Sequence, residues 1–256
     1  MIHTRQNQGI ERKTGLLRAP SVTVARLILA SYLLSGWMWS EFVLVLVFFA
    51  TLCFPFTESS VYFNGTSMFS LGSLAILGPA IMVRQATSAR TYLLLARLSS
   101  RAAYSRGLML AAAALRLPLY LYFLALVLLF HRLTDYTPDV LFWGFAGIIP
   151  ATMLVSVLTV GLCPPIATRR ELIVFLAWVA VMLFSFKPLI PLPAWLGELL
   201  SITQLPLWPL QSSYTLSLTG HFDLSSLLGL LLSIGYALII ALVAGRWLEK
   251  RELLLY

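Results

Sequence analysis

The sequence predicts an all-α membrane protein with a single transmembrane domain over residues 1–256. Hydrophobic residues make up 59% of the chain and charged residues only 11%, and the mean hydropathy is +0.88. Soluble domains carry roughly 25% charged residues, so a chain of this composition cannot cover its surface in water. Six apolar stretches are each long enough to cross the hydrocarbon core, which takes about 17–25 helical residues. They predict six transmembrane helices.

The elements are expected in the following order. Residues 1–20 form a polar cytoplasmic arm, and residues 21–36 form an amphipathic helix along the membrane surface. Transmembrane helices follow near residues 37–56, 67–85, 107–130, 139–162, 171–187 and 223–246. Several of these stretches contain proline, which membrane helices tolerate because neighbouring groups satisfy the carbonyls that proline leaves free.

Basic residues are divided unevenly between the predicted loops. Both termini and alternate loops together contain 15 of the 18 lysine and arginine residues. Because cytoplasmic loops of membrane proteins are enriched in these residues, the chain is predicted to be a multi-pass protein of the plasma (inner) membrane with both termini in the cytoplasm. The same asymmetry explains the net charge of +8 without nucleic acid as a partner.

A basic stretch follows the second predicted span, over residues 86–106. Arg90, Arg97 and Arg101 are seven and four residues apart, which places them on one helical face, and leucines form an apolar stripe beside them. A positive-inside loop that contacts anionic lipid headgroups is one explanation. A helix that docks a cytoplasmic partner is the other, and we favour it because the stretch is longer than orientation alone requires.

The connection before the last span, residues 188–222, is too apolar for an ordinary loop. Prolines interrupt it repeatedly, yet segments such as AWLGELLSI favour burial. We therefore expect short helices that re-enter the outer leaflet.

No pattern of catalytic or metal-binding residues is present. The three histidines are far apart, the chain has no HExxH, CxxC or GxSxG pattern, and none of its three lysines follows a glycine as a P-loop requires. The sequence thus predicts no catalytic residue, no metal site and no cofactor, and the protein is not expected to be an enzyme. Any ATP hydrolysis would come from another subunit.

The remaining candidate residues stand alone in the predicted spans. Arg116 lies within the third span, where a charge is costly and marks either a functional site or a structural ion pair, with Glu41 as the expected partner. Glu41 by itself is interpreted as an interfacial charge rather than a substrate ligand. Tyr120 and Tyr122 are expected to fill a helix interface or to line a translocation path.

Two further features concern small or polar residues near the spans. Residues 64–66 (Asn-Gly-Thr) match the N-glycosylation pattern in a segment expected outside the membrane. Gly72, Gly78, Gly229 and Gly235 are expected to allow close approach of helices.

The layout as a whole resembles the membrane subunit of ABC exporters of the ABC-2 type. The resemblance covers roughly residues 20–252. It is carried by the six spans, the entry helix at 21–36, the basic run RTYLLLARLSSRAAYSRGLMLAAAALRLPLYLY, the proline-broken outer connection and the final run GYALIIALVAGRWLEKREL. The outer loops between spans one and two and between spans three and four are short, so no large extracellular domain is expected.

The resemblance implies a function that composition alone does not. In such permeases the segment after the second span is a coupling helix that fits a groove of the ATPase; here it is about 86–104, with Arg90, Tyr92, Arg97 and Arg101 as candidate contacts. Two ATPase subunits and a second permease, a copy or a paralogue, are the implied partners. The chain would be the permease of an ATP-driven exporter, with Glu41, Arg116 and Tyr120 as candidates for the translocation path or for a buried charge.

Other functions stay open at this point. The main alternative is a non-catalytic membrane anchor or assembly subunit of a larger complex. A lipid-modifying enzyme is disfavoured because the spans lack clustered polar residues, and a secondary transporter or channel is hinted at only by Arg116.

Overall fold

The computed structural model describes residues 20–55, 58–86, 101–135, 137–163, 208–219 and 222–250. The cytoplasmic arm predicted before residue 20, the span predicted at 171–187, and most of the basic stretch and of the outer connection lie outside the described residues.

Four helices in the described part are long and apolar enough to cross a membrane. They are α4 (Ser60–Ala86), the consecutive pair α6 (Arg101–Ala114) and α7 (Arg116–Leu129), α8 (Pro138–Leu162) and α12 (Leu224–Lys250). A fifth is obtained if α2 (Pro20–Leu34) is counted together with α3 (Trp37–Phe48) and its π-helical extension η2 (Phe49–Cys53). The described part is thus almost entirely helical, with four or five helices apolar enough to span a membrane, which is consistent with an all-α membrane protein. The number of six spans stays a prediction.

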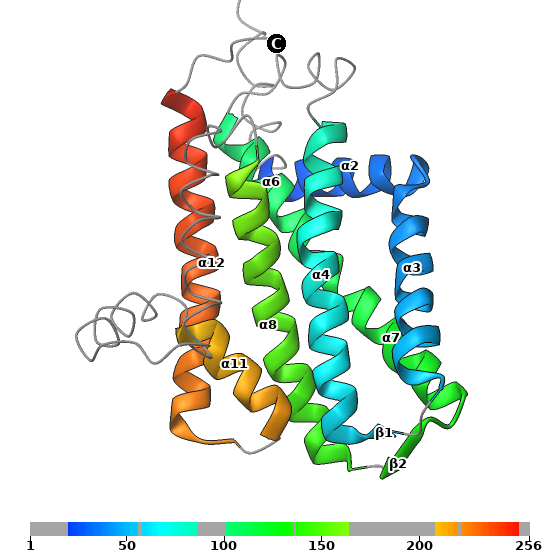
Figure 1. Cartoon of the computed structure of the whole chain (residues 1–256). Coiled ribbons are helices and arrows are strands. Elements are labelled where there is room, and N and C mark those ends of the chain that lie inside the picture. Colours follow the sequence, from blue (N-terminus) through cyan, green and yellow to red (C-terminus); the bar gives the residue numbers. More distant parts are fainter. Residues whose placement is uncertain are drawn as a thin grey trace, which may run out of the picture.

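The long helices lie side by side and form a bundle with two distinct ends (Figure 1). At one end, here called the α2 end, α2 crosses the bundle and bends by 70° into α3. At the opposite end, the β-pair end, the short strands β1 (Glu58–Ser59) and β2 (Leu133–Asp135) pair in parallel. The short helix α11 (Trp208–Thr219) packs against α8 and the first half of α12.

The corner between α2 and α3 is formed by Ser35 and Gly36. Gly36 has a φ of +80°, a left-handed conformation that costs glycine little. On α2 the buried residues Val24, Ile28 and Tyr32 recur every fourth position and so form one face. This helix packs along α6, where a Cβ at Gly107 would lie 2.6 Å from a methyl carbon of Val24. A helix therefore covers most of the predicted entry segment 21–36, and its amphipathic character and its position at a membrane surface stay predictions.

The helix after the first connection begins earlier than hydropathy indicates, at Ser60 rather than near residue 67. The additional turns contain Ser60, Asn64 and Thr66, which a hydropathy window scores as loop. These side chains are buried in the protein, where they bond to backbone carbonyls. Polar residues on an inward face are compatible with a membrane helix when their hydrogen bonds are satisfied within the protein.

The third long helix is interrupted at Leu115, between α6 and α7. Pro118 follows three residues later. A proline has no N–H to donate to the carbonyl four residues earlier, and its ring collides with that carbonyl. The regular hydrogen bonding is therefore interrupted at Leu115, whose backbone stays helical, and residues 102–129 still form one helix long enough to span a membrane.

The outer surface of the bundle carries large apolar side chains. On α12 and α3 the exposed residues include leucine, isoleucine, valine and tryptophan along most of their length. In water such a continuous apolar surface promotes association, whereas in lipid it is the expected outer face of a spanning helix.

The β-pair end is held by hydrogen bonds across the two strands. Asp135 Oδ1 accepts the backbone N–H of Ser60 at 2.9 Å, and the hydroxyl of Ser60 donates to the carbonyl of Asp135. The N–H of Thr137 in turn approaches that hydroxyl oxygen at 3.4 Å. Asp135 thus caps α4 from a distant part of the chain, because the first N–H groups of a helix lack partners within it.

Replacing Asp135 by alanine is expected to lower the free energy of unfolding by about 1–2 kcal/mol, because the N–H of Ser60 loses its acceptor. Asp135→Asn keeps an acceptor oxygen and is expected to lose less. Thermal unfolding in detergent, followed by dye labelling of the two free cysteines, measures both changes. Equal losses in the two variants would contradict the capping role.

Candidate functional site

An ion pair is buried between helices near the α2 end of the bundle. Arg116 Nη2 on α7 lies 3.2 Å from Glu41 Oε2 on α3, and the two side chains are 0% and 2% exposed. The structure therefore brings together the two charges that the sequence offered as partners. Glu41 is a buried charge in the folded chain, one of the roles expected of it, and its position relative to a membrane interface stays a prediction.

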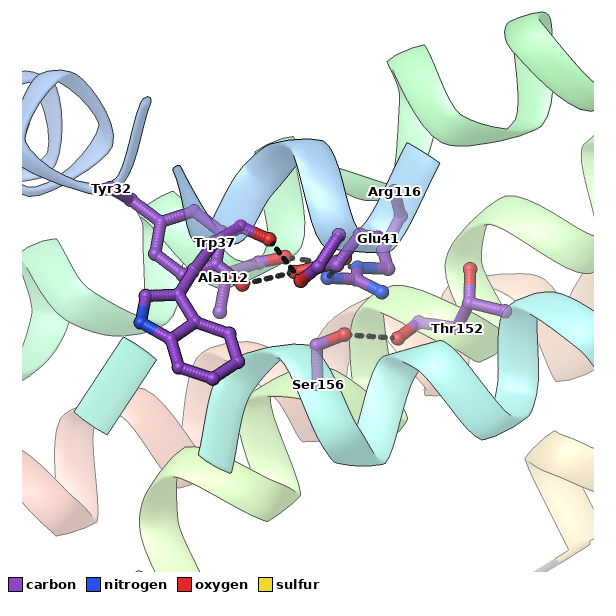
Figure 2. Close-up of polar contacts among 8 residues, drawn as sticks. Tyr32, Trp37, Glu41, Ala112, Arg116, Thr152 and Ser156 are labelled. Atoms are coloured by element: carbon purple, nitrogen blue, oxygen red, sulfur yellow. Dashed lines mark hydrogen bonds and ion pairs between the residues drawn. The ribbon is translucent and has the colours of Figure 1, made fainter. Parts of the chain in front are cut away.

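Tyr32 completes this cluster from α2. Its hydroxyl donates to Glu41 Oε1 at 2.6 Å, and the tyrosine is 1% exposed. Figure 2 shows the three side chains converging from α2, α3 and α7. Arg116 also approaches the carbonyl of Ala112 through Nε at 3.3 Å. We call Tyr32, Glu41 and Arg116 the buried charge cluster.

A fourth helix, α4, lies close to the cluster at Gly78, where no side chain separates the backbone from the Glu41 carboxylate. A Cβ at Gly78 of α4 would overlap Glu41 Oε1, far inside the van der Waals distance. The carboxylate thus occupies the space that any larger residue at this position would take. Pro79 follows directly, within α4.

The cluster affects the arrangement of the helices more than the net stability of the fold. Removing two charges from water costs several kcal/mol for each ion, and the attraction between them returns this only in good geometry. A buried pair therefore adds little net stability compared with apolar residues, but leaving either partner alone costs about 3–5 kcal/mol. Tyr32, Glu41 and Arg116 consequently hold their three helices in one arrangement.

The cluster offers little for covalent chemistry. Its carboxylate is bonded on both oxygens, to a phenol and to a guanidinium, and each partner is fully buried. Within the described residues, no group of three His, Cys, Asp or Glu side chains is close enough to hold a metal ion. The arrangement is suited to couple the movements of helices, because a shift of α2 changes the hydrogen bond from Tyr32 to Glu41.

Tyr120 lies one turn beyond Arg116 on the same helix and has different surroundings. Its ring packs against Phe63 of α4 and Phe145 of α8, with centroids 6.5 and 5.3 Å away. Its hydroxyl is buried without a hydrogen-bond partner among the described residues. This packing agrees with the expectation of a filled helix interface, and Tyr122 likewise packs edge-on against Phe42 at 5.1 Å.

The candidate partner-binding residues are outside the region that the structure describes, with one exception. Arg90, Tyr92 and Arg97 fall between α4 and α6. Arg101 is the first residue of α6, and its side chain is not among those described. Their role stays a prediction.

The glycosylation pattern at Asn64 has a structural explanation instead. Asn64 is fully buried inside α4, its amide donates to the carbonyl of Val140 at 3.0 Å, and its side chain lies directly on Gly144. An enzyme that attaches a glycan has no access to this nitrogen in the folded protein. The residue joins α4 to α8.

Two of the four glycines singled out in the sequence do provide close contacts. Gly78 accommodates Glu41, and Gly229 of α12 accommodates the side chain of Ser212 on α11. A Cβ at Gly72 or Gly235 would meet no atom of the described residues within 4 Å, so these two glycines make no close approach within that part of the chain. Sequence reasoning missed Tyr32 as a cluster member; the only available signal was a phenol on the face of α2 that packs inward.

Comparisons with known proteins do not assign the chain to a protein family. It matches no family model, no characterised protein and no solved structure. The functional argument therefore rests on the residues and contacts of this chain alone.

The ion pair is tested by a double-mutant cycle with Glu41→Gln and Arg116→Met. Each single variant is expected to lower the unfolding free energy by about 3–5 kcal/mol, because a buried partner is left behind, and the double variant by clearly less than the sum. Thermal unfolding in detergent provides the readout, and Arg26→Met, at an exposed position of α2, serves as the neutral control. Additive effects would show that the pair is not coupled.

Gly78→Ala is expected to destabilise the protein by about 1–3 kcal/mol, because the new methyl group displaces the Glu41 carboxylate. Gly72→Ala is the matched control on the same helix, where a Cβ meets none of the described atoms and alanine favours the helix. The same unfolding assay compares them, and equal effects would refute the close contact at Gly78.

Proposed function

We propose that the chain is the membrane permease subunit of an ATP-driven exporter, which forms part of a translocation path and couples to a separate ATPase. The proposal is supported by the order of elements: an entry helix bent by 70° from the next helix, long apolar helices, and a short helix before the last one. The entry helix and the long apolar helices are among the features on which the resemblance to ABC-2 permeases rests.

The arginines described within the bundle support one orientation. Arg26, Arg84, Arg106 and Arg246 belong to the parts of α2, α4, α6 and α12 at the α2 end, and Arg132 belongs to the β-pair end. Cytoplasmic boundaries are the ones enriched in arginine. The α2 end is therefore the cytoplasmic end in this proposal, and the membrane is the plasma (inner) membrane.

The observation that carries the proposal is a hydrogen bond between the two ends of the basic stretch, which belong to α4 and α6. The hydroxyl of Tyr104 on α6 donates to the carbonyl of Ala86, the last residue of α4, at 2.6 Å. Residues 87–100 connect α4 and α6 in the chain. This one hydrogen bond therefore joins the two ends of the basic stretch to each other, and both ends belong to helices of the bundle. In this proposal, a segment attached in this way transfers a displacement caused by a cytoplasmic partner to the spans.

Further contacts define a route by which that displacement reaches the other helices. From α6 it reaches α2 through the close packing of Gly107 on Val24. From α2 it reaches α3 and α7 through Tyr32, Glu41 and Arg116. Rigid, close-packed elements of this kind move as units, which is how domain motions reach distant helices.

The implied assembly contains subunits that this chain does not supply. The sequence has no P-loop, so two ATPase subunits are proposed to bind ATP and to close on each other. A second permease, either a copy or a paralogue, completes the path. The lipid bilayer covers the apolar outer faces.

The test is purification of the tagged chain from its native cells in mild detergent, with mass spectrometry of the proteins that accompany it. A P-loop ATPase is expected to co-purify, and the triple variant Arg90→Glu, Arg97→Glu and Arg101→Glu is expected to lose it at least about tenfold, because the docking face changes sign. The matched control changes Arg5, Arg12 and Arg18 to glutamate, which alters the net charge equally without touching the basic stretch.

The outcomes separate the candidate functions. Loss of the ATPase in the first variant and its retention in the control support the exporter and its docking site. Absence of any ATPase, with other membrane proteins as the stable partners, would replace the exporter by the anchor or assembly subunit.

A further inference from the structure

A pocket of about 390 Å³ is lined by residues of α11 and of the start of α12. Its lining combines five hydroxyl side chains with the carboxylate of Asp223, the amide of Gln211 and the indole of Trp208. Ligand pockets in proteins usually range from about 300 to 1,000 Å³ and contain a few well-placed polar groups. Neither the buried charge cluster nor the proposed docking stretch uses these residues.

The pocket cannot face lipid. Gln211 and Asp223 are exposed, and an exposed amide or carboxylate is excluded from the hydrocarbon region because nothing there replaces the hydrogen bonds of water. The neighbouring surface of α12 is apolar, with Leu224 and Leu231 exposed. The polar patch therefore marks a side of the bundle that opens to water.

The hydroxyl groups of the pocket have all donated their protons within the protein. On α11, Ser212 donates to the carbonyl of Ser225, Thr215 to that of Gln211, and Thr219 to that of Thr215. At the start of α12, the hydroxyls of Ser225 and Ser226 both donate to Asp223. A hydroxyl whose proton is engaged has only lone pairs left for a ligand.

Asp223 adds a negative charge to these acceptors. Its Oδ1 caps α12 by accepting from the N–H and the hydroxyl of Ser226, while Oδ2 accepts one bond, from Ser225. A carboxylate offers about four acceptor positions, so Oδ2 keeps capacity for a ligand. Hydrogen bonds, chiefly those from Ser226, hold the pKa of Asp223 below its usual range, so it is ionised at neutral pH.

A pocket that is rich in acceptors and carries one negative charge complements a ligand that only donates. We propose that this pocket binds a primary ammonium group of a small organic molecule. An ammonium has three donors, no acceptor and one positive charge. Trp208 adds an aromatic ring to the lining, which attracts a cation and also packs against the apolar part of the ligand.

A neutral polyol fits this lining less well. Each of its hydroxyls brings an acceptor that needs a donor, and the donors of the lining are confined to the amide of Gln211 and the indole of Trp208. The same reasoning disfavours an anion, which Asp223 repels. The ligand chemistry thus follows from the direction of the hydrogen bonds rather than from the residue types.

The test compares glucosamine and glucose, which differ by one ammonium group and are both small enough for the pocket. Saturation-transfer NMR on the purified full chain, in a detergent without sugar headgroups and below the pKa of the glucosamine amine, measures binding. Glucosamine is expected to bind at least about tenfold more tightly than glucose, a difference of about 1.4 kcal/mol. Equal binding of the two sugars, or no binding of glucosamine, overturns the proposal.

Asp223→Asn assigns the site. Asparagine caps a helix as well as aspartate does, so α12 is retained while the charge is lost, and glucosamine affinity is expected to fall at least about tenfold. Asp139→Asn, in the first turn of α8 and outside the pocket lining, is the matched control and is expected to bind like the unaltered chain. Unchanged binding in Asp223→Asn overturns the proposal.

A second variant covers the case in which Asp223→Asn fails to fold. Thr215→Leu places a larger apolar side chain on the exposed, pocket-lining face of α11, away from the cap, and is expected to abolish glucosamine binding. Persistent binding in this variant places the ligand elsewhere and overturns the proposal. The measurement uses no ATPase, so its outcome is independent of the proposed exporter function.

Discussion

In an apolar interior neither the carboxylate of Glu41 nor the guanidinium of Arg116 is tolerated alone, so each requires the other within contact distance. This requirement fixes α3 against α7. The hydroxyl of Tyr32 extends the constraint to α2 across the corner at Gly36, and Gly78 extends it to α4 by leaving room for the carboxylate. The cluster thus ties α2, α3, α4 and α7 together at the α2 end.

The two ends of the bundle are held by different means, and the difference suits the proposed function. At the β-pair end, Asp135 and Ser60 form neutral and charge-assisted hydrogen bonds that fasten two connections. At the α2 end, the entry helix rests on α6 and is tied to the ion pair. An end that receives force from a partner needs contacts that move together, and charged groups that cannot separate without large cost provide them.

Hydroxyl side chains have two roles in this molecule, and the direction of their hydrogen bonds separates them. Inside the bundle, Thr152 and Ser156 of α8 donate to carbonyls of their own helix, which lets polar residues pack in an apolar interior. Between α11 and α12 the same internal donation occurs next to open space and an ionised carboxylate. There it leaves a surface of acceptors, and the chemistry of the ligand follows from that surface.

The membrane class, most helix positions, the charge asymmetry and the buried charge at Arg116 could all be predicted from the amino-acid order, because hydropathy and charge are properties summed along the chain. The start of α4 was misplaced, since Ser60 and Asn64 look like loop residues until their partners Asp135 and Val140 are known. The membership of Tyr32 and Gly78 in the site of Glu41, and the enclosure of Asn64, became visible only in the folded chain. Those relations are distances between helices far apart in sequence, and no local pattern contains them.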